Sequence, residues 1–275
     1  MLLTVLALLA FAGNSLLCRY ALRDGGIDAA SFTALRLGAG ALALGLLAWR
    51  PRRGAAEPGR QGDWASALAL FAYAAAFSYA YLGLTAATGA LLLFGAVQLT
   101  MLGRGFALGE RLDSWQWLGV LVAAAGLAVL LRPGLAAPSP VHAALMLAAG
   151  VAWGVYSLRG RGSRDPLRTT AGNFLRTLPL AALLLALGWR AAHVQPDGVL
   201  AALASGALAS GVGYALWYAA LPALRASTAG ILQLSVPVLA AAGGIALLGE
   251  PLGWRFAAAA ALTLGGVALA TLRAR

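Results

Sequence analysis

Three side-chain amides, those of Asn14, Gln98 and Gln233, stand inside long apolar stretches of the sequence. Polar side chains are costly at membrane depth, and they usually face a cavity or a partner helix. The two glutamine amides offer donors and acceptors together, so they could hold both a carboxylate and an ammonium group. For Asn14 the alternative is an interhelical hydrogen bond, which contributes about 0.6 kcal/mol on average in a membrane protein.

Pro237 is a second feature close to Gln233. A proline inside a helix leaves the carbonyl four residues earlier without its donor, and here that carbonyl belongs to Gln233. Together with the Ser235 hydroxyl, a free carbonyl would suit an ammonium group, as it does at other broken membrane helices. The alternative is a simple kink whose carbonyl is satisfied by a neighbouring helix.

Aromatic side chains gather on three of the apolar stretches. A spacing of three or four residues places each group on one face of a helix. Such a face can stack on a ring or hold a cation, so we expect these residues to line a cavity. The groups are Tyr73, Phe77 and Tyr81, then Trp153 and Tyr156, then Tyr214, Trp217 and Tyr218.

Two arginines, Arg36 and Arg176, lie well inside the apolar stretches, each about seven residues from a helix end. That spacing corresponds to a depth of roughly 10 Å, within reach of a side chain that snorkels to the membrane surface. We therefore expect packing or lipid-headgroup contact for both, with substrate binding as the alternative. All nine Asp and Glu residues fall in loops or at helix ends.

These residues are carried by ten apolar runs of the length that a membrane-spanning helix needs, about 20 residues. The 275-residue chain is 61% hydrophobic and 11% charged, well outside the range of soluble domains. The runs lack the alternation of a membrane barrel, and their connections are short. The sequence therefore predicts an all-α integral membrane protein with ten transmembrane helices in one compact domain. The runs are residues 2–22, 29–49, 64–83, 85–106, 115–132, 141–158, 169–189, 199–220, 226–248 and 254–272.

Arginines set the predicted orientation. The loops after the even-numbered helices, together with the C-terminus, hold thirteen of the 20 basic residues, and the opposite loops hold five. Because basic residues are retained in the cytoplasm, both termini should be cytoplasmic. A cleaved signal peptide is the alternative for residues 2–12, but no basic segment precedes them.

Composition excludes several kinds of chemistry. Every basic residue is an arginine, so a Schiff-base lysine and a Walker lysine are both absent. Cys18 is the single cysteine, which excludes an internal disulfide and a multi-cysteine metal site. The net charge of +11 lies in membrane loops, so nucleic-acid binding is not expected. No cofactor and no metal are predicted.

The second half of the chain repeats the first at a shift of about 140 residues. Leu108-Gly109-Glu110 recurs as Leu248-Gly249-Glu250, and Leu35-Arg36 recurs as Leu175-Arg176. We assign the halves to residues 1–135 and 136–275. Because each half has an odd number of helices, the two must enter the membrane in opposite directions. Such inverted repeats are typical of secondary transporters, whose binding site lies between the halves near the midplane.

Residues 83–131 and their echo at 223–270 also resemble the EamA branch of the drug/metabolite transporter superfamily. The resemblance rests on the doubled Leu-Gly-Glu, each followed by a helix that contains a glycine, Gly126 or Gly266. It extends over essentially the whole chain. It implies ten helices in inverted repeats and export of amino acids and other metabolites, with the aromatic amino-acid exporters among the types it looks most like. One departure is Val97-Gln98, which stands where the second half has Pro237-Val238, so a proline break in the fourth helix is in doubt.

The predicted function is export of small metabolites, in particular amino acids and among them the aromatic ones, by alternating access. The predicted location is the plasma membrane, which is the inner membrane of a bacterium. Proton-coupled pumps generally need a titratable group within the membrane, so the lack of a carboxylate there favours facilitated export. A proton-coupled multidrug or metabolite efflux pump is the alternative.

Other classes of protein fit the sequence less well. An enzyme would need a carboxylate pair, a metal cluster or a nucleophile with a base, and no such set is evident. A non-transporting scaffold or lipid-binding protein would not explain the inverted repeat. The predicted partners are a small-molecule substrate and the lipid bilayer, and the predicted assembly is a monomer or a weak homodimer.

Overall fold

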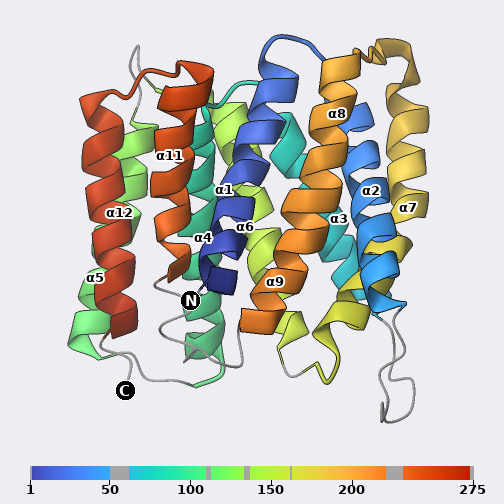
Figure 1. Ribbon diagram of the computed structural model, residues 1–275. Coiled ribbons are helices and arrows are strands. Elements are labelled where there is room, and N and C mark those ends of the chain that lie inside the picture. The colour runs from blue at the N-terminus through green and yellow to red at the C-terminus, as the bar shows by residue number, and fades with distance from the viewer. Residues whose placement is uncertain are drawn as a thin grey trace.

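The structure is a computed structural model that describes residues 2–49, 62–109, 113–132, 137–161, 163–220 and 232–272. Within these ranges the regular elements are helices, and they form one bundle (Figure 1). The first half contains α1 (Leu2–Arg23), α2 (Ala29–Ala48), α3 (Trp64–Ala80), α4 (Ala86–Ala107) and α5 (Ser114–Leu131). The second half contains α6 (Pro140–Gly160), α7 (Pro166–Gly188), η1 (Trp189–Ala191), α8 (Pro196–Ala204), η2 (Ser205–Val212), α9 (Gly213–Ala220), α11 (Ser235–Leu248) and α12 (Trp254–Leu272).

The helices have the length and composition of membrane spans. Seven described segments are long and apolar enough to cross a bilayer, with α8, η2 and α9 forming one of them. Three shorter apolar helices, α3, α11 and α12, lie at the remaining predicted runs. The prediction of an all-α membrane protein is confirmed, whereas the count of ten spans stays a prediction. α1 begins and α12 ends at the same end of the bundle (Figure 1), but which side of the membrane this end faces is not tested.

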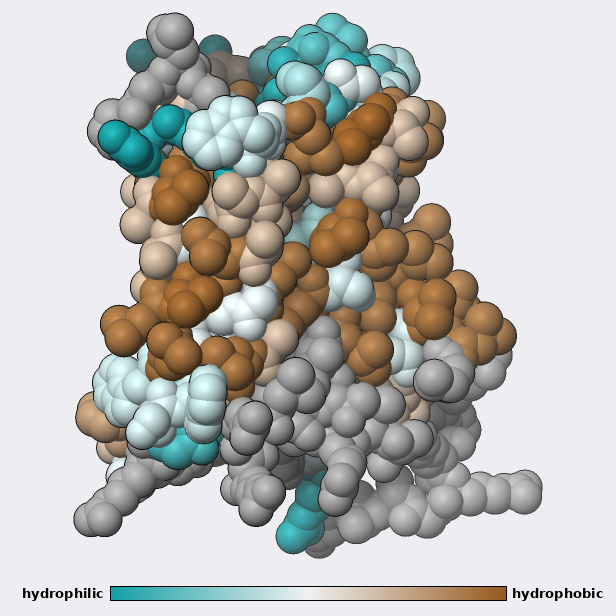
Figure 2. All heavy atoms as spheres, turned by 90° about the vertical axis from the view of Figure 1, so that its left-hand side faces the viewer, coloured by the Kyte–Doolittle hydropathy of each residue, from teal (hydrophilic) through white to brown (hydrophobic). Residues whose placement is uncertain are grey.

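One side of the bundle displays an apolar band. Figure 2 shows this side, on which apolar side chains cover the middle and hydrophilic ones gather at the upper end. The exposed apolar side chains of α5 include Leu118 and Leu121, and Trp115 and Trp254 lie exposed where α5 and α12 begin. Exposed leucines between tryptophans at the helix ends are typical of a surface that faces lipid.

Several helices have an aspartate as their N-cap residue. Asp28, Asp63, Asp113 and Asp165 are the N-cap residues of α2, α3, α5 and α7, and each side chain accepts a backbone N–H of the first turn. A cap of this kind satisfies an N–H group that has no partner within the helix. This role accounts for the position of these acidic residues at helix ends.

The two halves are interleaved. α5 packs on α12, α2 on α7 and α3 on α6, so helices of one half lie against helices of the other. α5 and α12 approach closely because Gly119 and Gly126 of α5 have no side chain. A side chain at Gly119 would meet the backbone of Gly266, and one at Gly126 would meet Thr263. Small residues allow such contacts between membrane helices. The boundary between residues 1–135 and 136–275 stays a prediction.

The segment from Pro196 to Ala220 changes helix type in its middle. η2 is a π-helix between the α-helical α8 and α9. π-helical turns are rare, and they are often found at functional sites. A side chain at Gly206 of η2 would meet the carbonyl of Arg36 in α2. The glycine therefore lets α2 lie directly against η2.

The orientation can be tested by cysteine labelling in a Cys18→Ala background. Because the arginine distribution places the loop that contains Ser163 in the cytoplasm, a cysteine there should be shielded from membrane-impermeant thiol reagents in intact cells. A cysteine at Ala137, in a loop at the opposite end, should be labelled. Labelling at position 163 and protection at position 137 would reverse the topology. Gly54, another predicted cytoplasmic position, lies outside the described residues.

Candidate functional site

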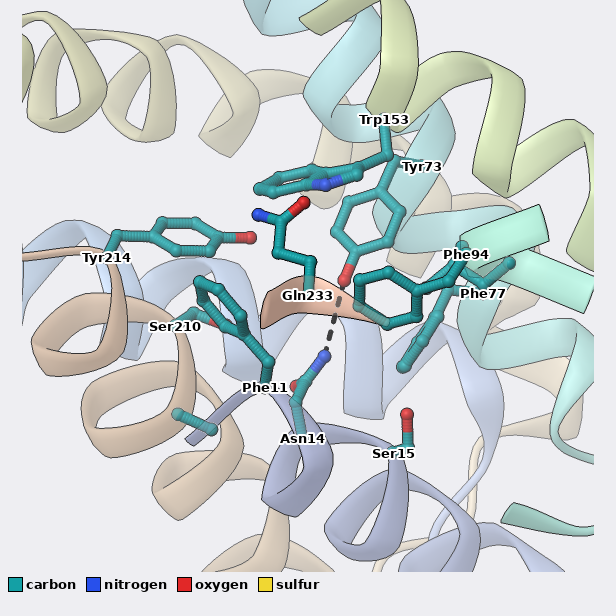
Figure 3. Close-up of a pocket in the computed structure, with 12 residues that line it drawn as sticks. Phe11, Asn14, Ser15, Tyr73, Phe77, Phe94, Trp153, Ser210, Tyr214 and Gln233 are labelled. Atoms are coloured by element: carbon teal, nitrogen blue, oxygen red, sulfur yellow. Dashed lines mark hydrogen bonds between the residues drawn. The ribbon is translucent and has the colours of Figure 1, made fainter. Parts of the chain in front are cut away.

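A small cavity lies in the middle of the bundle, where the two halves meet. α1, α3 and α4 contribute side chains from the first half, and α6, η2, α9 and Gln233 contribute from the second. Its volume is about 20 Å³, far below the roughly 300 Å³ or more of a typical ligand pocket. In this conformation the site is nearly closed around its lining. The lining residues are Phe11, Asn14, Ser15, Tyr73, Phe77, Leu93, Phe94, Trp153, Ala209, Ser210, Tyr214 and Gln233 (Figure 3).

Stacked rings form one wall of the cavity. The Trp153 and Tyr214 rings lie 5.2 Å apart at an interplanar angle of 27°, and the Tyr73 ring lies 4.9 Å from Trp153. Phe11 contacts Tyr214 at 5.9 Å. Figure 3 shows the Gln233 side chain pointing into this group, with its amide beside Trp153. The wall therefore combines aromatic faces with one amide.

Hydrogen-bonded polar groups form the opposite wall. The Asn14 amide donates to the Tyr73 hydroxyl over 3.3 Å, and the Ser205 hydroxyl donates to the Asn14 carbonyl over 2.6 Å. These bonds connect α1, α3 and η2. Two roles were predicted for Asn14, a place in the lining of a cavity and an interhelical hydrogen bond. In the structure Asn14 lines the cavity and also makes interhelical hydrogen bonds.

Arg36 lies directly behind the Tyr73 side of the cavity. Its side chain is 1% exposed, Nη2 donates to the Tyr73 hydroxyl over 2.9 Å, and Nε lies 3.5 Å from the Ser210 hydroxyl. The guanidinium also lies 4.9 Å from the centre of the Phe77 ring. Of the two roles expected for Arg36, packing and lipid-headgroup contact, the second is wrong, because hydroxyl groups on α3 and η2 hold the side chain inside the bundle. Arg176, at the equivalent position of the other half, is half-buried and donates to the Gly172 carbonyl.

Six of the predicted residues line the cavity and six do not. The side chains that the structure brings together are Asn14, Tyr73, Phe77, Trp153, Tyr214 and Gln233. Those outside the lining are Tyr81, Gln98, Tyr156, Trp217, Tyr218 and Ser235.

The residues outside the lining have local contacts of their own. Tyr81 contacts the Phe77 ring and donates to the Ala86 carbonyl, beyond the end of α3. Tyr156 lies against Trp153, and Trp217 lies edge-on against Phe11. These three aromatic residues support the rings of the wall rather than form it.

Gln98 and Ser235 also lie apart from the cavity. Gln98 is 4% exposed, and its Nε2 has no hydrogen-bond partner among the described residues. The Ser235 hydroxyl donates to the Leu232 carbonyl over 2.6 Å. Leu234 lies in a turn and α11 begins at Ser235, so Pro237 occupies the first turn of α11. A proline costs little there, because a first-turn N–H has no partner inside the helix.

Some lining residues were not predicted from the sequence, namely Phe11, Ser15, Leu93, Phe94, Ala209 and Ser210. Phe11, Asn14 and Ser15 are spaced as i, i+3 and i+4, so they share one face of α1. That face could have been found from Asn14 alone. Ser210 gave no such signal, because the π-helix that presents it is not visible in an apolar stretch of sequence.

Metal ligands do not gather in the described part of the chain. Among residues 2–49, 62–109, 113–132, 137–161, 163–220 and 232–272, no group of three or more His, Cys, Asp or Glu side chains could hold a metal ion. The chemistry available at the cavity is therefore that of amides, hydroxyls, aromatic rings and one buried guanidinium.

A helical membrane bundle with a central site between two interleaved halves has the architecture of a secondary transporter. The chain belongs to the EamA-like transporter family, which matches residues 1–132 and again residues 142–272. The resemblance noted in the sequence is thereby confirmed. The protein is a multi-pass membrane transporter of the inner membrane, as predicted.

Individual relatives are also similar over much of the chain. The chain is 59% identical over 269 residues to the uncharacterized protein PA1977 of Pseudomonas aeruginosa. The aligned residues cover 98% of this chain and 93% of that protein. It is 34% identical over 188 residues, or 64% of each chain, to the aromatic amino acid exporter YddG of Ancylobacter novellus. A solved crystal structure of a protein has a similar fold, with a TM-score of 0.68, 25% identity and 99% of both chains covered.

Proposed function

We propose that this protein exports amino acids, with a preference for aromatic side chains, by alternating access between the two sides of the membrane. The observation that carries the proposal is the central cavity, which has an aromatic wall facing a polar wall. An amino acid has the same division, because one end is charged and the other is its side chain. Aromatic rings favour stacking with a ring, and amides can bond both charged groups of a zwitterion.

The size of the cavity fits a transporter between its open states. An amino acid does not fit in about 20 Å³, so α1, α3 and η2 must separate before the substrate enters. Alternating access supplies such a motion, since one set of helices rocks against the other around the central site. The interleaved halves of this bundle are the natural units of that motion.

The relative in Ancylobacter novellus gives independent support. That protein is named an aromatic amino acid exporter, and the shared family is one of transporters. The aromatic wall of the cavity is consistent with the same class of substrate in this chain.

Transport by purified protein in liposomes tests the proposal. Labelled phenylalanine, tyrosine and tryptophan should enter protein-containing liposomes faster than protein-free ones, and faster than alanine or arginine. An excess of unlabelled tryptophan should compete with labelled phenylalanine. A protein that transports none of these compounds, while it remains folded and inserted, would contradict amino-acid export.

Transport should need no proton gradient. In the described part of the chain, Asp197 lies in the first turn of α8 and the other carboxylates lie in loops or at N-caps, so none is deep inside a membrane-spanning helix. Asp63, the N-cap residue of α3, cannot respond to neutral pH. Partial burial raises the pKa of Asp63, but bonds from Ser66 and Arg159 outweigh this effect and lower the pKa to about 2. Flux should therefore follow the substrate gradient and change little when a protonophore is added. Uphill accumulation driven by an imposed pH gradient would instead favour the proton-coupled efflux alternative.

A further inference from the structure

Arg36 is a cation inside the membrane region without an acidic partner among the described residues. Its side chain is 1% exposed, and its Nη1 is buried with no hydrogen-bond partner. The groups that contact the guanidinium are the hydroxyls of Tyr73 and Ser210 and the rings of Tyr73 and Phe77. All of these groups are neutral. A buried charge is strongly disfavoured unless it is paired, and charges at membrane depth usually mark a ligand path.

Four other arginines in the described part of the chain have carboxylates within reach. Their ion pairs are Arg19–Glu250, Arg23–Asp24, Arg159–Asp63 and Arg168–Asp165. Those pairs lie near the ends of helices, and the Arg159–Asp63 pair is exposed to water. Arg36 differs because its surroundings supply hydroxyl groups and aromatic faces but no negative charge.

The position of Arg36 connects its charge to the cavity. Tyr73, Phe77 and Ser210, which contact the guanidinium, all line the cavity. Asn14 bonds the same Tyr73 hydroxyl from the other side. The Tyr73 and Ser210 side chains, which bond the guanidinium, therefore lie between Arg36 and the cavity.

We propose that Arg36 binds the carboxylate of the transported substrate, so that the cavity selects organic anions and zwitterions over amines and amides. This inference deepens the proposed function and rests on it. Arginine suits the role because its planar guanidinium forms charge-assisted bonds with a carboxylate. The Tyr73 and Ser210 hydroxyls hold the guanidinium in place, and the aromatic wall receives the side chain of the substrate.

The wild-type protein in liposomes gives the first test. Phenylalanine should compete with labelled phenylalanine roughly ten- to a hundredfold better than phenylalaninamide or phenylethylamine, since both lack the carboxylate and a bond to a charged group is lost. Equal competition by the three compounds would overturn the carboxylate site and leave amino-acid export standing. Absence of any phenylalanine uptake would overturn both proposals together.

Variants of Arg36 give the second test. Arg36→Gln should lose phenylalanine uptake by about ten- to a hundredfold and should no longer discriminate phenylalanine from its amide, whereas Arg36→Lys should keep part of the discrimination. The matched control is Arg176→Gln, which removes the equivalent arginine of the other half and should leave the discrimination intact. Equal losses for phenylalanine and its amide in Arg36→Gln would show that Arg36 only supports the fold.

An inorganic anion is the other source of a negative charge at Arg36. Replacement of chloride by sulfate in the liposome buffers should leave phenylalanine uptake unchanged if the substrate carboxylate is the partner. Uptake that requires chloride in the wild type and not in Arg36→Gln would overturn the proposal.

Discussion

Replacing Gln233 with alanine should reduce uptake of aromatic amino acids in liposomes by about ten- to a hundredfold. The Gln233 amide points into the aromatic wall of the cavity (Figure 3), so we expect it to bond a charged end of the substrate. Loss of a hydrogen bond to a charged group costs about 1.5–3 kcal/mol, which corresponds to that change in affinity. The fold should survive, because individual hydrogen bonds contribute little to the stability of membrane helices.

Gln98 provides the matched control for this experiment. It is also a buried glutamine in the membrane region, but it does not line the cavity. Gln98→Ala should transport at close to the wild-type rate at equal expression. Equal losses in the two variants would show that the effect is structural, and wild-type uptake by Gln233→Ala would place the substrate elsewhere.

Much of the fold could be predicted from the sequence, because lipid imposes a simple rule on the chain. Each apolar run has to satisfy its own backbone as a helix, so the positions of the helices follow from hydropathy. α3 shows the limit of this reading, since the run was predicted over residues 64–83 but the helix ends at Ala80. Tyr81, Leu82 and Gly83 are apolar enough to extend the run, but they form the turn that leads to α4.

The cavity was harder to predict, because a helix face shows which residues lie together but not what they face. Tyr73 and Phe77 line the cavity, whereas Tyr81, on the same predicted face, lies past the helix end. Tyr214 lines the cavity, whereas Trp217, three residues later, lies outside the lining and contacts the ring of Phe11. The depth of a residue along its helix, together with the crossing of neighbouring helices, decides between these outcomes.

Arg36 shows how a general rule can fail at a buried position. Depth alone allowed its side chain to reach the membrane surface, as long basic side chains often do. The close approach of η2 at Gly206 instead places Ser210 beside the guanidinium, with Tyr73 on the other side. Neither contact can be read from the sequence near Arg36, since the partners lie 37 and 174 residues away.

Glu250 joins the two halves at the end of the bundle where α1 ends. Its carboxylate accepts from Arg19 Nε over 2.9 Å and from the backbone N–H of Ala86, the first residue of α4, over 2.8 Å. Arg19 also donates to the Tyr81 carbonyl over 2.9 Å. One carboxylate of the second half therefore holds α1 and α4 of the first.

A second ion pair joins the halves at the opposite end. Arg159 of α6 donates to Asp63, the N-cap of α3, over 2.8 Å. Arg159 lies 140 residues after Arg19, so the two arginines occupy comparable positions near the end of the first helix of each half. The predicted inversion of the halves would place these arginines at opposite ends. In alternating access the two ends open in turn, so each pair is placed to hold one end closed.

Replacing Glu250 with glutamine should therefore open the cavity toward the end where α1 ends. Arg19 and Glu250 are 18% and 9% exposed, so water does little to offset the loss of their charged bond. A loss of about 1.5–3 kcal/mol would shift the population toward the open state by about ten- to a hundredfold. Glutamine keeps the size of the side chain and an oxygen that can accept from Ala86, which limits the damage to the fold.

The measurement is the labelling rate of a cysteine at Ser15, a lining residue, in a Cys18→Ala background. In the predicted topology, the end of the bundle where α1 ends faces the outside of the cell. A membrane-impermeant thiol reagent added outside intact cells should therefore label this cysteine about tenfold faster or more in Glu250→Gln than with Glu250 present. The matched control is Asp63→Asn, which breaks the pair with Arg159 at the other end, while asparagine still caps α3. It should not increase labelling from outside. Unchanged labelling in Glu250→Gln would show that this ion pair is not what keeps that end of the cavity closed.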